Sequence, residues 1–201
     1  MIKTVHCLLS INQEEVSVPK NRAGVDRQLK EEEILDAAEA AFLGPGGFRN
    51  TTIAAIAAQA GIATNSVHWY FPTKDDLFVA VLRRRLEEAL ARLLTEPLPP
   101  LTELVLAALH ELDRTASLTA TVHDRAAHVP AVAEFHHGFH EVAERSLQEA
   151  FQREGLTDGD AFMAARAITA LVEGLHLHDR KRDSKDRDRL VLWALRRFTG
   201  R

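Results

Sequence analysis

The sequence predicts an all-α protein, and three observations lead to this prediction. Ala, Leu, Glu and Arg are the dominant residues, whereas aromatic residues make up only 6%, so intrinsic propensity favours helix over strand. Apolar residues recur at helical spacing through most of the chain, and clusters of glycine or proline separate these runs. With 46% hydrophobic and 27% charged residues, the 201-residue chain is expected to fold around a packed core.

The first predicted helix covers residues 26–42, where apolar positions recur at helical spacing, and the run GPGG stops it. A short second helix is predicted to begin at Thr51 or Thr52, either of which can cap it, and to end at Gly61. A third helix is expected from Thr64 or Asn65 until Phe71-Pro72 breaks it. Two short helices around a glycine turn are typical of a helix-turn-helix unit.

A longer fourth helix is predicted to begin after Thr73 and to end before the run PLPP at 97–100. This proline-rich break is the best candidate for a domain boundary. Beyond it, helical periodicity predicts five further helices, at about 101–113, 116–127, 130–153, 158–179 and 185–198. The charge-dense run between the last two, DRKRDSKDRDR at 179–189, is interpreted as a solvated turn because acidic and basic residues alternate in it.

Charge and cysteine content narrow the possible environments. The net charge is −4, and residues 20–94 contain ten basic and ten acidic side chains, so composition gives no evidence of general affinity for polyanions. The single cysteine, Cys7, excludes an intramolecular disulfide, and no run of about 18 apolar residues could span a membrane. We therefore expect a cytoplasmic protein without a membrane partner, whose residues 1–25 form a mobile extension and not a signal peptide.

From about Ile34 to Val81 the sequence resembles the tetracycline-repressor (TetR) family of bacterial transcription regulators. The resemblance rests on residue types at fixed spacing across nearly the whole of this segment. The matching residues are AAFLGPGGF, Thr51-Thr52, Ile56-Ala57, Ala60-Gly61-Ile62, Tyr70-Phe71, Lys74 and Leu77.

The resemblance implies a three-helix helix-turn-helix DNA-binding domain and a roughly six-helix effector and dimerisation domain. Residues 26–72 would form the DNA-binding domain, residues 73–96 a connecting helix, and residues 97–201 the ligand-binding and dimerisation domain. It also implies a repressor that binds a partly palindromic DNA operator as a homodimer, and a small-molecule effector that releases the DNA. No cofactor is expected.

The predicted DNA contacts lie around the third helix. Its exposed edge is expected to touch base edges in the major groove, while Val67 faces inward and Phe71 belongs to the core. Thr51, Thr52, Tyr70 and Lys74 are candidates for phosphate contacts, against the alternatives of helix capping, a half-buried ring and a solvated lysine. The predicted base-reading residues are Thr64, Asn65, Ser66, His68 and Trp69.

Three positions in or next to the third helix depart from the family pattern. Asn65 stands where the family often has glycine, His68 where tyrosine is common, and Ala63 where serine usually caps the helix. The operator sequence therefore cannot be inferred from a relative.

The last two predicted helices each carry more than one apolar row, as expected for helices that contact their own core and a partner together. The alternative is burial entirely within one subunit. By resemblance these helices pair in a dimer, and the candidate interface residues are Phe162, Ile168, Leu171, Leu175, Leu190, Trp193, Ala194 and Arg197.

The sequence identifies the effector-binding residues less clearly than the predicted DNA contacts. Apolar and polar side chains of the second half could line a cavity, although the alternative for each is ordinary core packing. The candidate ligand contacts are His110, His123, Phe135, Phe139, His140 and Phe162. His136 and His140 share a helix face as metal-binding histidines often do, but two ligands do not make a site and no metal is predicted.

No catalytic function is predicted, because no nucleophile motif, P-loop or dinucleotide-binding loop occurs in a suitable context. The competing hypothesis assumes the same fold but a different function. In that reading the protein is a small-molecule or metal sensor with weak or no specific DNA binding.

Overall fold

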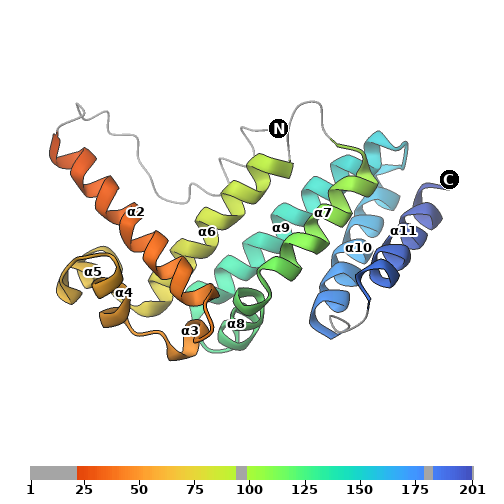
Figure 1. The fold of residues 1–201 in the computed structure, drawn as a ribbon. Helices are drawn as coiled ribbons and strands as arrows, with labels where there is room; N and C mark the ends of the chain where they lie inside the picture. The colour runs from red at the N-terminus through yellow and green to blue at the C-terminus, as the bar shows by residue number, and fades with distance from the viewer. Residues whose placement is uncertain (1–21, 94–98, 179–182, 201) are drawn as a thin grey trace. The chain divides into compact units, whose positions relative to one another are not determined.

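The computed structural model describes residues 22–93, 99–178 and 183–200, which form helices and no strand (Figure 1). The prediction of an all-α protein is confirmed. The helices of the described residues are α2 (Arg22–Leu43), α3 (Gly47–Asn50), α4 (Ile53–Gln59), α5 (Thr64–Tyr70), α6 (Lys74–Leu93), α7 (Leu101–Arg114), α8 (Ala116–Ala126), α9 (Pro130–Arg153), α10 (Asp158–His178) and α11 (Ser184–Thr199).

Two differences from the predicted elements have simple causes. The four-residue helix α3 lies just after the predicted break, because Gly47 adopts a φ of 58° and the chain then makes one helical turn. Helix α2 begins at Arg22, inside the predicted extension 1–25. The rest of that extension, residues 94–98, which include the first half of the proline-rich run, and residues 179–182 of the predicted solvated turn lie outside the described residues.

Contacts divide the chain into two compact units. The first unit contains the described residues up to Arg85 together with Thr121–Phe135, and the second contains Leu86–Ala120 and the described residues from His136 onward. The division falls inside α6 and not at the proline-rich run. The predicted functional domains therefore stay a prediction, with α6 continuing from one unit into the other.

The core of the first unit is built where α2 packs against α3 and α4, and where α4 packs against α5. Phe42, Phe48 and Phe78 form an aromatic cluster whose ring centroids lie 4.8–5.6 Å apart. Aromatic pairs at this separation stabilise a core beyond the area they bury. Ile56 and Val67 are fully buried and fix the two short helices on this core.

The core of the second unit lies where α10 packs against α7 and α11, and where α11 packs against α7. Ile168, Leu109 and Leu195 are among its most buried residues. An ion cluster at one edge joins the three helices: Arg187 of α11 donates two hydrogen bonds to the Asp113 carboxylate of α7, at 2.9 and 2.7 Å. His176 of α10 lies 3.1 Å from the same carboxylate.

Burial by itself raises the pKa of the Asp113 carboxyl, but hydrogen bonds from Arg187 and His176 outweigh it and hold the pKa below its ordinary value of 3.8. The carboxylate is thus kept charged beside a buried guanidinium.

Among the described helices, none combines the length and the apolar character that a membrane crossing requires.

Candidate nucleic-acid interface

The turn between α4 and α5 sets the direction of the predicted recognition helix. Gly61 adopts a φ of 68°, in the left-handed region that side chains disfavour. The amide of Ile62 donates to the carbonyl of Ala57 at 3.0 Å, and that of Gly61 donates to the carbonyl of Ala58 at 3.3 Å. These paired bonds form a Schellman motif, which ends α4 and turns the chain within three residues.

Helix α5 has one buried and one exposed side. Val67 is fully buried, whereas Thr64, Asn65, Ser66 and His68 are exposed. Trp69 is 65% exposed, which is unusual for a large aromatic residue. Phe71 is buried and Tyr70 is half-buried. The predicted orientation of this helix is therefore confirmed, and its five candidate base-reading residues share solvent-facing positions.

Two internal contacts orient the aromatic side chains of this edge. The Nδ1 atom of His68 lies 3.1 Å from the carbonyl oxygen of Pro72, and because a carbonyl only accepts, Nδ1 carries the hydrogen. The guanidinium of Arg27, from α2, lies 4.7 Å from the centre of the Trp69 ring. Sequence reasoning missed Arg27, which lies 42 positions from Trp69 and gives no local signal.

Thr51 does not present its hydroxyl for a phosphate contact, which corrects that part of the expectation. The residue is buried, and its hydroxyl donates to the Gly47 carbonyl at 2.7 Å and approaches the Ala41 carbonyl at 3.3 Å. Thr52 is exposed and caps α4, because its hydroxyl accepts a hydrogen bond from the amide of Ala55 at 3.1 Å. A phosphate contact by Thr52 stays a prediction.

Lys74 is also engaged inside the first unit. Its ammonium donates to the carbonyl oxygens of Phe48 and Thr51, each at 2.9 Å, and lies 4.2 Å from the centre of the Phe48 ring. Burial lowers the pKa of Lys74, and the nearby Arg125 lowers it further, while Asp75 acts in the opposite direction. The lysine thus holds the segment between α3 and α4, and at most one of its three donors remains for a phosphate.

Carboxylates of α2 neutralise two arginines in the middle of α6. Arg84 donates to Glu32, Asp36 and Glu39 of α2, at 3.1, 2.7 and 2.7 Å, and Arg85 also pairs with Glu39. Arg49, in contrast, is 86% exposed, and its nearest carboxylate, Asp124, is 3.9 Å away. These three carboxylates of α2 therefore pair with α6. As a result, a unit with equal numbers of acidic and basic residues can still carry exposed cations such as Arg27 and Arg49.

Residues 34–81 match the sequence profile of the bacterial regulatory proteins of the tetR family. Over this segment the chain is similar to the TetR family. The matched segment runs from the second half of α2 through α3, α4 and α5 into the first part of α6, and it contains the exposed edge described above.

Solved structures of transcriptional regulators share this fold over most of their length. A TetR transcription regulator from Haloarcula marismortui superposes with a TM-score of 0.70 at 24% identity, covering 86% of this chain and 97% of that one. A transcriptional regulator from Rhodococcus sp. Rha1 gives 0.65 at 24% identity, covering 85% and 94%. A transcriptional regulator from Saccharomonospora viridis in complex with choline gives 0.65 at 21% identity, covering 82% and 94%. No curated protein matches the chain significantly.

The second unit of the chain contains a groove of about 400 Å³ between α9 and α10. Of the six predicted ligand contacts only His140 lines it. His110 pairs with Asp188 at 2.9 Å, Phe139 packs against the His140 ring, and Phe162 is exposed. His123 and Phe135 belong to the first unit. The groove is lined by His140, Glu144, Met163, Arg166, Ala167, Thr169, Ala170 and Glu173.

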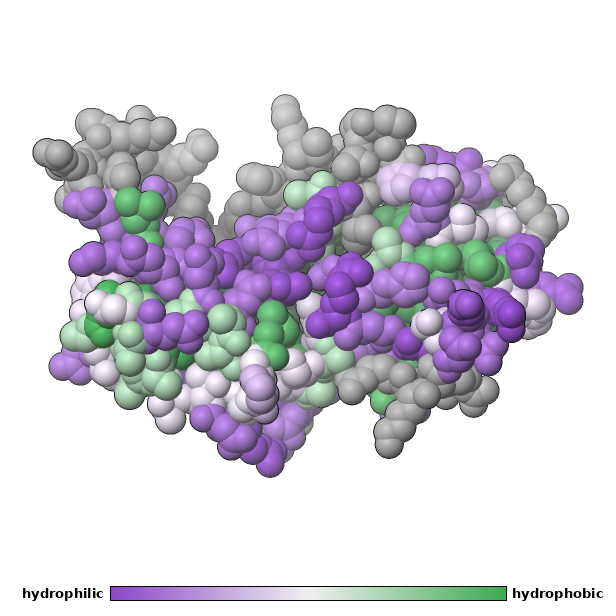
Figure 2. Space-filling view, viewed as in Figure 1, coloured by the Kyte–Doolittle hydropathy of each residue, from purple (hydrophilic) through white to green (hydrophobic). Residues whose placement is uncertain are grey.

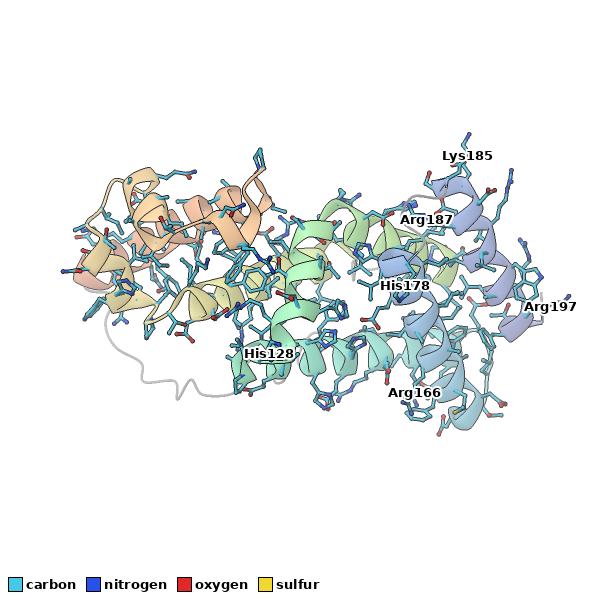
Figure 3. All side chains as sticks on the ribbon, turned by 90° about the horizontal axis from the view of Figure 1, so that it is seen from below. His128, Arg166, His178, Lys185, Arg187 and Arg197 are labelled. Carbon is cyan, nitrogen blue, oxygen red and sulfur yellow. The ribbon has the colours of Figure 1, made fainter. Side chains whose placement is uncertain are left out.

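The predicted dimer residues separate into two sets. Ile168, Leu175 and Ala194 are buried in the core of their own subunit, which corrects their assignment to the interface. Leu171 is half-buried against the same core. Phe162, Leu190, Trp193 and Arg197 are exposed, and Figure 2 shows hydrophobic residues at the surface over α10 and α11. Arg197, which points away from the helices in Figure 3, lies 5.5 Å from the centre of the Trp193 ring.

Proposed function

We propose that this TetR-family regulator is a repressor that binds a partly palindromic operator as a homodimer and releases it when a small molecule binds. The observation that supports this most is the orientation of α5. Val67 and the turn at Gly61 fix the helix on the core, while Asn65, His68 and Trp69 remain exposed. A short helix held in this way fits the major groove, where its side chains reach base edges.

The chemistry of the exposed edge suggests how bases are read. The Asn65 amide has both a donor and an acceptor, the combination that pairs with adenine in the major groove. With Nδ1 of His68 committed to Pro72, the free Nε2 of the neutral imidazole is an acceptor for an exocyclic amino group. Trp69 offers an apolar face for a thymine methyl group, and Arg27 behind it supplies positive charge near the backbone.

The proposed dimer uses the exposed apolar residues of α10 and α11. Trp193 is 51% exposed and Leu190 is 41% exposed, on a helix whose opposite face is buried in the core. Large aromatic residues left exposed beside an arginine are typical of the centre of a protein interface. A twofold pair of such faces would place two α5 helices on successive major grooves, about 34–36 Å apart or a multiple of that spacing.

The proposed switch links the effector site to the recognition helices through α6. This helix continues from the first unit into the second, so a ligand that shifts it changes the separation of the two α5 helices. Release requires the ligand to prefer the spacing that mismatches the operator. The groove with His140, Arg166 and Glu173 is the proposed site, and the complex of the Saccharomonospora viridis relative with choline supports a small-molecule effector.

The test is enrichment of duplexes from a random-sequence library by the full-length protein, followed by mobility shift with a polyanion competitor. We expect an inverted repeat to be enriched and retained. A variant with Asn65→Ala, His68→Ala and Trp69→Ala together should lose this retention while unfolding at the wild-type temperature, because all three side chains are exposed.

Absence of any enriched sequence would favour the second candidate function, a small-molecule or metal sensor without specific DNA binding. The observation in its favour is that two predicted phosphate contacts are engaged inside the first unit: Thr51 through its hydroxyl hydrogen and Lys74 through two of its three donors. Enrichment that persists in the triple variant would contradict the role of α5 instead.

A further inference from the structure

Three potential metal ligands converge in the second unit from two consecutive helices, α9 and α10. His136 and His140 lie four residues apart on α9, so their rings share one face of the helix. Their Nε2 atoms are 3.1 Å apart. The Oε1 atom of Glu173, on α10, lies 3.6 Å from the Nε2 of His136 and 3.4 Å from that of His140. A single carboxylate oxygen therefore faces both imidazoles.

We propose that His136, His140 and Glu173 bind a divalent transition-metal ion of the zinc class. Ligand atoms about 2.0–2.1 Å from a tetrahedral zinc ion lie about 3.4 Å from one another, close to the separations of the three atoms here. Two imidazoles and one carboxylate are also a ligand set that zinc accepts while keeping a coordination position open.

The three side chains are accessible to an ion, and neighbouring residues restrain them. The side chains of His136, His140 and Glu173 are 27%, 23% and 29% exposed, so they are neither sealed in the core nor free to sample many rotamers. The two rings are almost perpendicular, at 86°, with their centroids 4.6 Å apart. Packing of Phe139 against His140 limits the movement of that ring.

The groove provides the remaining contacts. His140 and Glu173 both line it, so an open coordination position would face its space. Thr169, one turn before Glu173 on α10, also lines the groove, and its buried hydroxyl oxygen makes no hydrogen bond among the described residues. Arg166, labelled in Figure 3, projects from the same helix. A water or an anion on the metal would therefore meet a hydroxyl group and a guanidinium.

A purely structural explanation exists and makes a different prediction. The two Nε2 atoms at 3.1 Å can share one hydrogen, and the Glu173 carboxylate can accept a hydrogen bond from a protonated ring. In that case the cluster joins α9 and α10 by hydrogen bonds and has no affinity for a metal. Titration with the metal alone distinguishes the two, because hydrogen bonding needs no ion.

The experiment is a competition titration of Zn²⁺ between the tag-free full-length protein and a chromophoric chelator, without DNA. We expect one zinc ion per chain and no competition from Mg²⁺, which prefers all-oxygen ligands. His140→Ala and Glu173→Gln should each weaken binding about tenfold or more. His137→Ala, on the same helix but 79% exposed and paired with Glu141, is the matched control and should bind like wild type.

Weaker zinc binding in Glu173→Gln would not be caused by misfolding, because the amide keeps the size of the side chain. Absence of stoichiometric zinc binding in the wild-type protein, or equal loss in His137→Ala and His140→Ala, would overturn the proposal. The outcome is independent of the proposed repressor function, since a chain that binds zinc but no operator, or an operator but no zinc, separates the two.

Discussion

At the scale of single residues, side chains near the proposed interface serve the fold as well as DNA. Lys74 illustrates this, because two of its donors bind carbonyls of Phe48 and Thr51 that lie 26 and 23 residues away. The sequence pattern identified the residue but not this role, since the acceptors are backbone atoms whose position depends on the turn of α3. The same reason explains the wrong expectation for the hydroxyl of Thr51.

Lys74→Ala should therefore lower stability as well as DNA affinity. Loss of its two hydrogen bonds should cost about 1–3 kcal/mol, because two carbonyls lose a charged donor. If the third donor also reaches a phosphate, the salt dependence of DNA binding should flatten by about one contact. Urea denaturation and binding at several salt concentrations measure the two effects, and Lys30→Ala, an exposed lysine of α2, is the control. Wild-type stability in Lys74→Ala would refute the structural role of its bonds to the carbonyls of Phe48 and Thr51.

Asp113 gives the second prediction at this scale. Asp113→Asn should lose about 3 kcal/mol, because it leaves the Arg187 guanidinium buried without its counter-ion. Asp186→Asn, which breaks an exposed pair with Arg189, should cost at most about 1 kcal/mol. Chemical denaturation of the three proteins measures both differences.

The pH dependence of stability follows from the lowered pKa of Asp113. The carboxylate stabilises the folded state fully above its unfolded pKa, near 3.8, and this contribution is lost as the pH falls through the lower folded value. The wild-type protein should thus lose this stability below about pH 3.8, whereas Asp113→Asn should lack that component. Parallel acid-unfolding curves for the two proteins would contradict the assignment.

At the scale of elements, the sequence predicted helix ends best where glycine or proline interrupts the helical spacing of apolar residues. The bounds of α5 through α11 agree with expectation within a few residues, because each helix ends at such a signal or in a polar turn. Helix α3 was missed because four residues carry no period. Val67 could be predicted as the buried residue of α5, whereas the contacts of Arg27 and Glu173 depend on how one helix packs against another.

The turn before α5 yields a prediction for this scale. Gly61→Ala should destabilise the protein by about 1–2 kcal/mol, because a side chain there is strained at a φ of 68° even though no atom blocks it. Gly174→Ala, inside α10 and equally unobstructed, should instead be stabilising by up to about 1 kcal/mol. Denaturation midpoints with opposite signs are expected; a neutral Gly61→Ala would show that the turn does not need glycine.

At the scale of the whole molecule, the proposed repressor requires two copies. The sequence predicts that the last two helices pair, which stays a prediction, and it could not separate residues that face the core from those left exposed. Both kinds are apolar, and α10 and α11 have apolar rows on more than one face. Packing against α7 decides the matter, leaving Phe162, Leu190 and Trp193 exposed.

Trp193→Asp should convert the dimer to monomers at micromolar concentration. Removing an aromatic residue from the centre of an interface costs about 2 kcal/mol or more, which is roughly 30-fold in the dimer dissociation constant. Leu29→Asp, an equally polar change at an exposed leucine of α2, should leave assembly unchanged. Sedimentation equilibrium measures both, and a wild-type chain that sediments as a monomer would remove the twofold operator from the proposal.

The most direct test of DNA reading by α5 is the affinity of wild type, His68→Ala and His128→Ala for an enriched duplex and its single base-pair variants. His128 is an exposed histidine outside α5, labelled in Figure 3. A wrong base pair should cost wild type and His128→Ala about 1–3 kcal/mol at each contacted position. His68→Ala should lose this discrimination at one position in each half-site and keep it elsewhere. An identical discrimination profile for all three proteins would contradict the assignment of α5 as the helix that reads DNA.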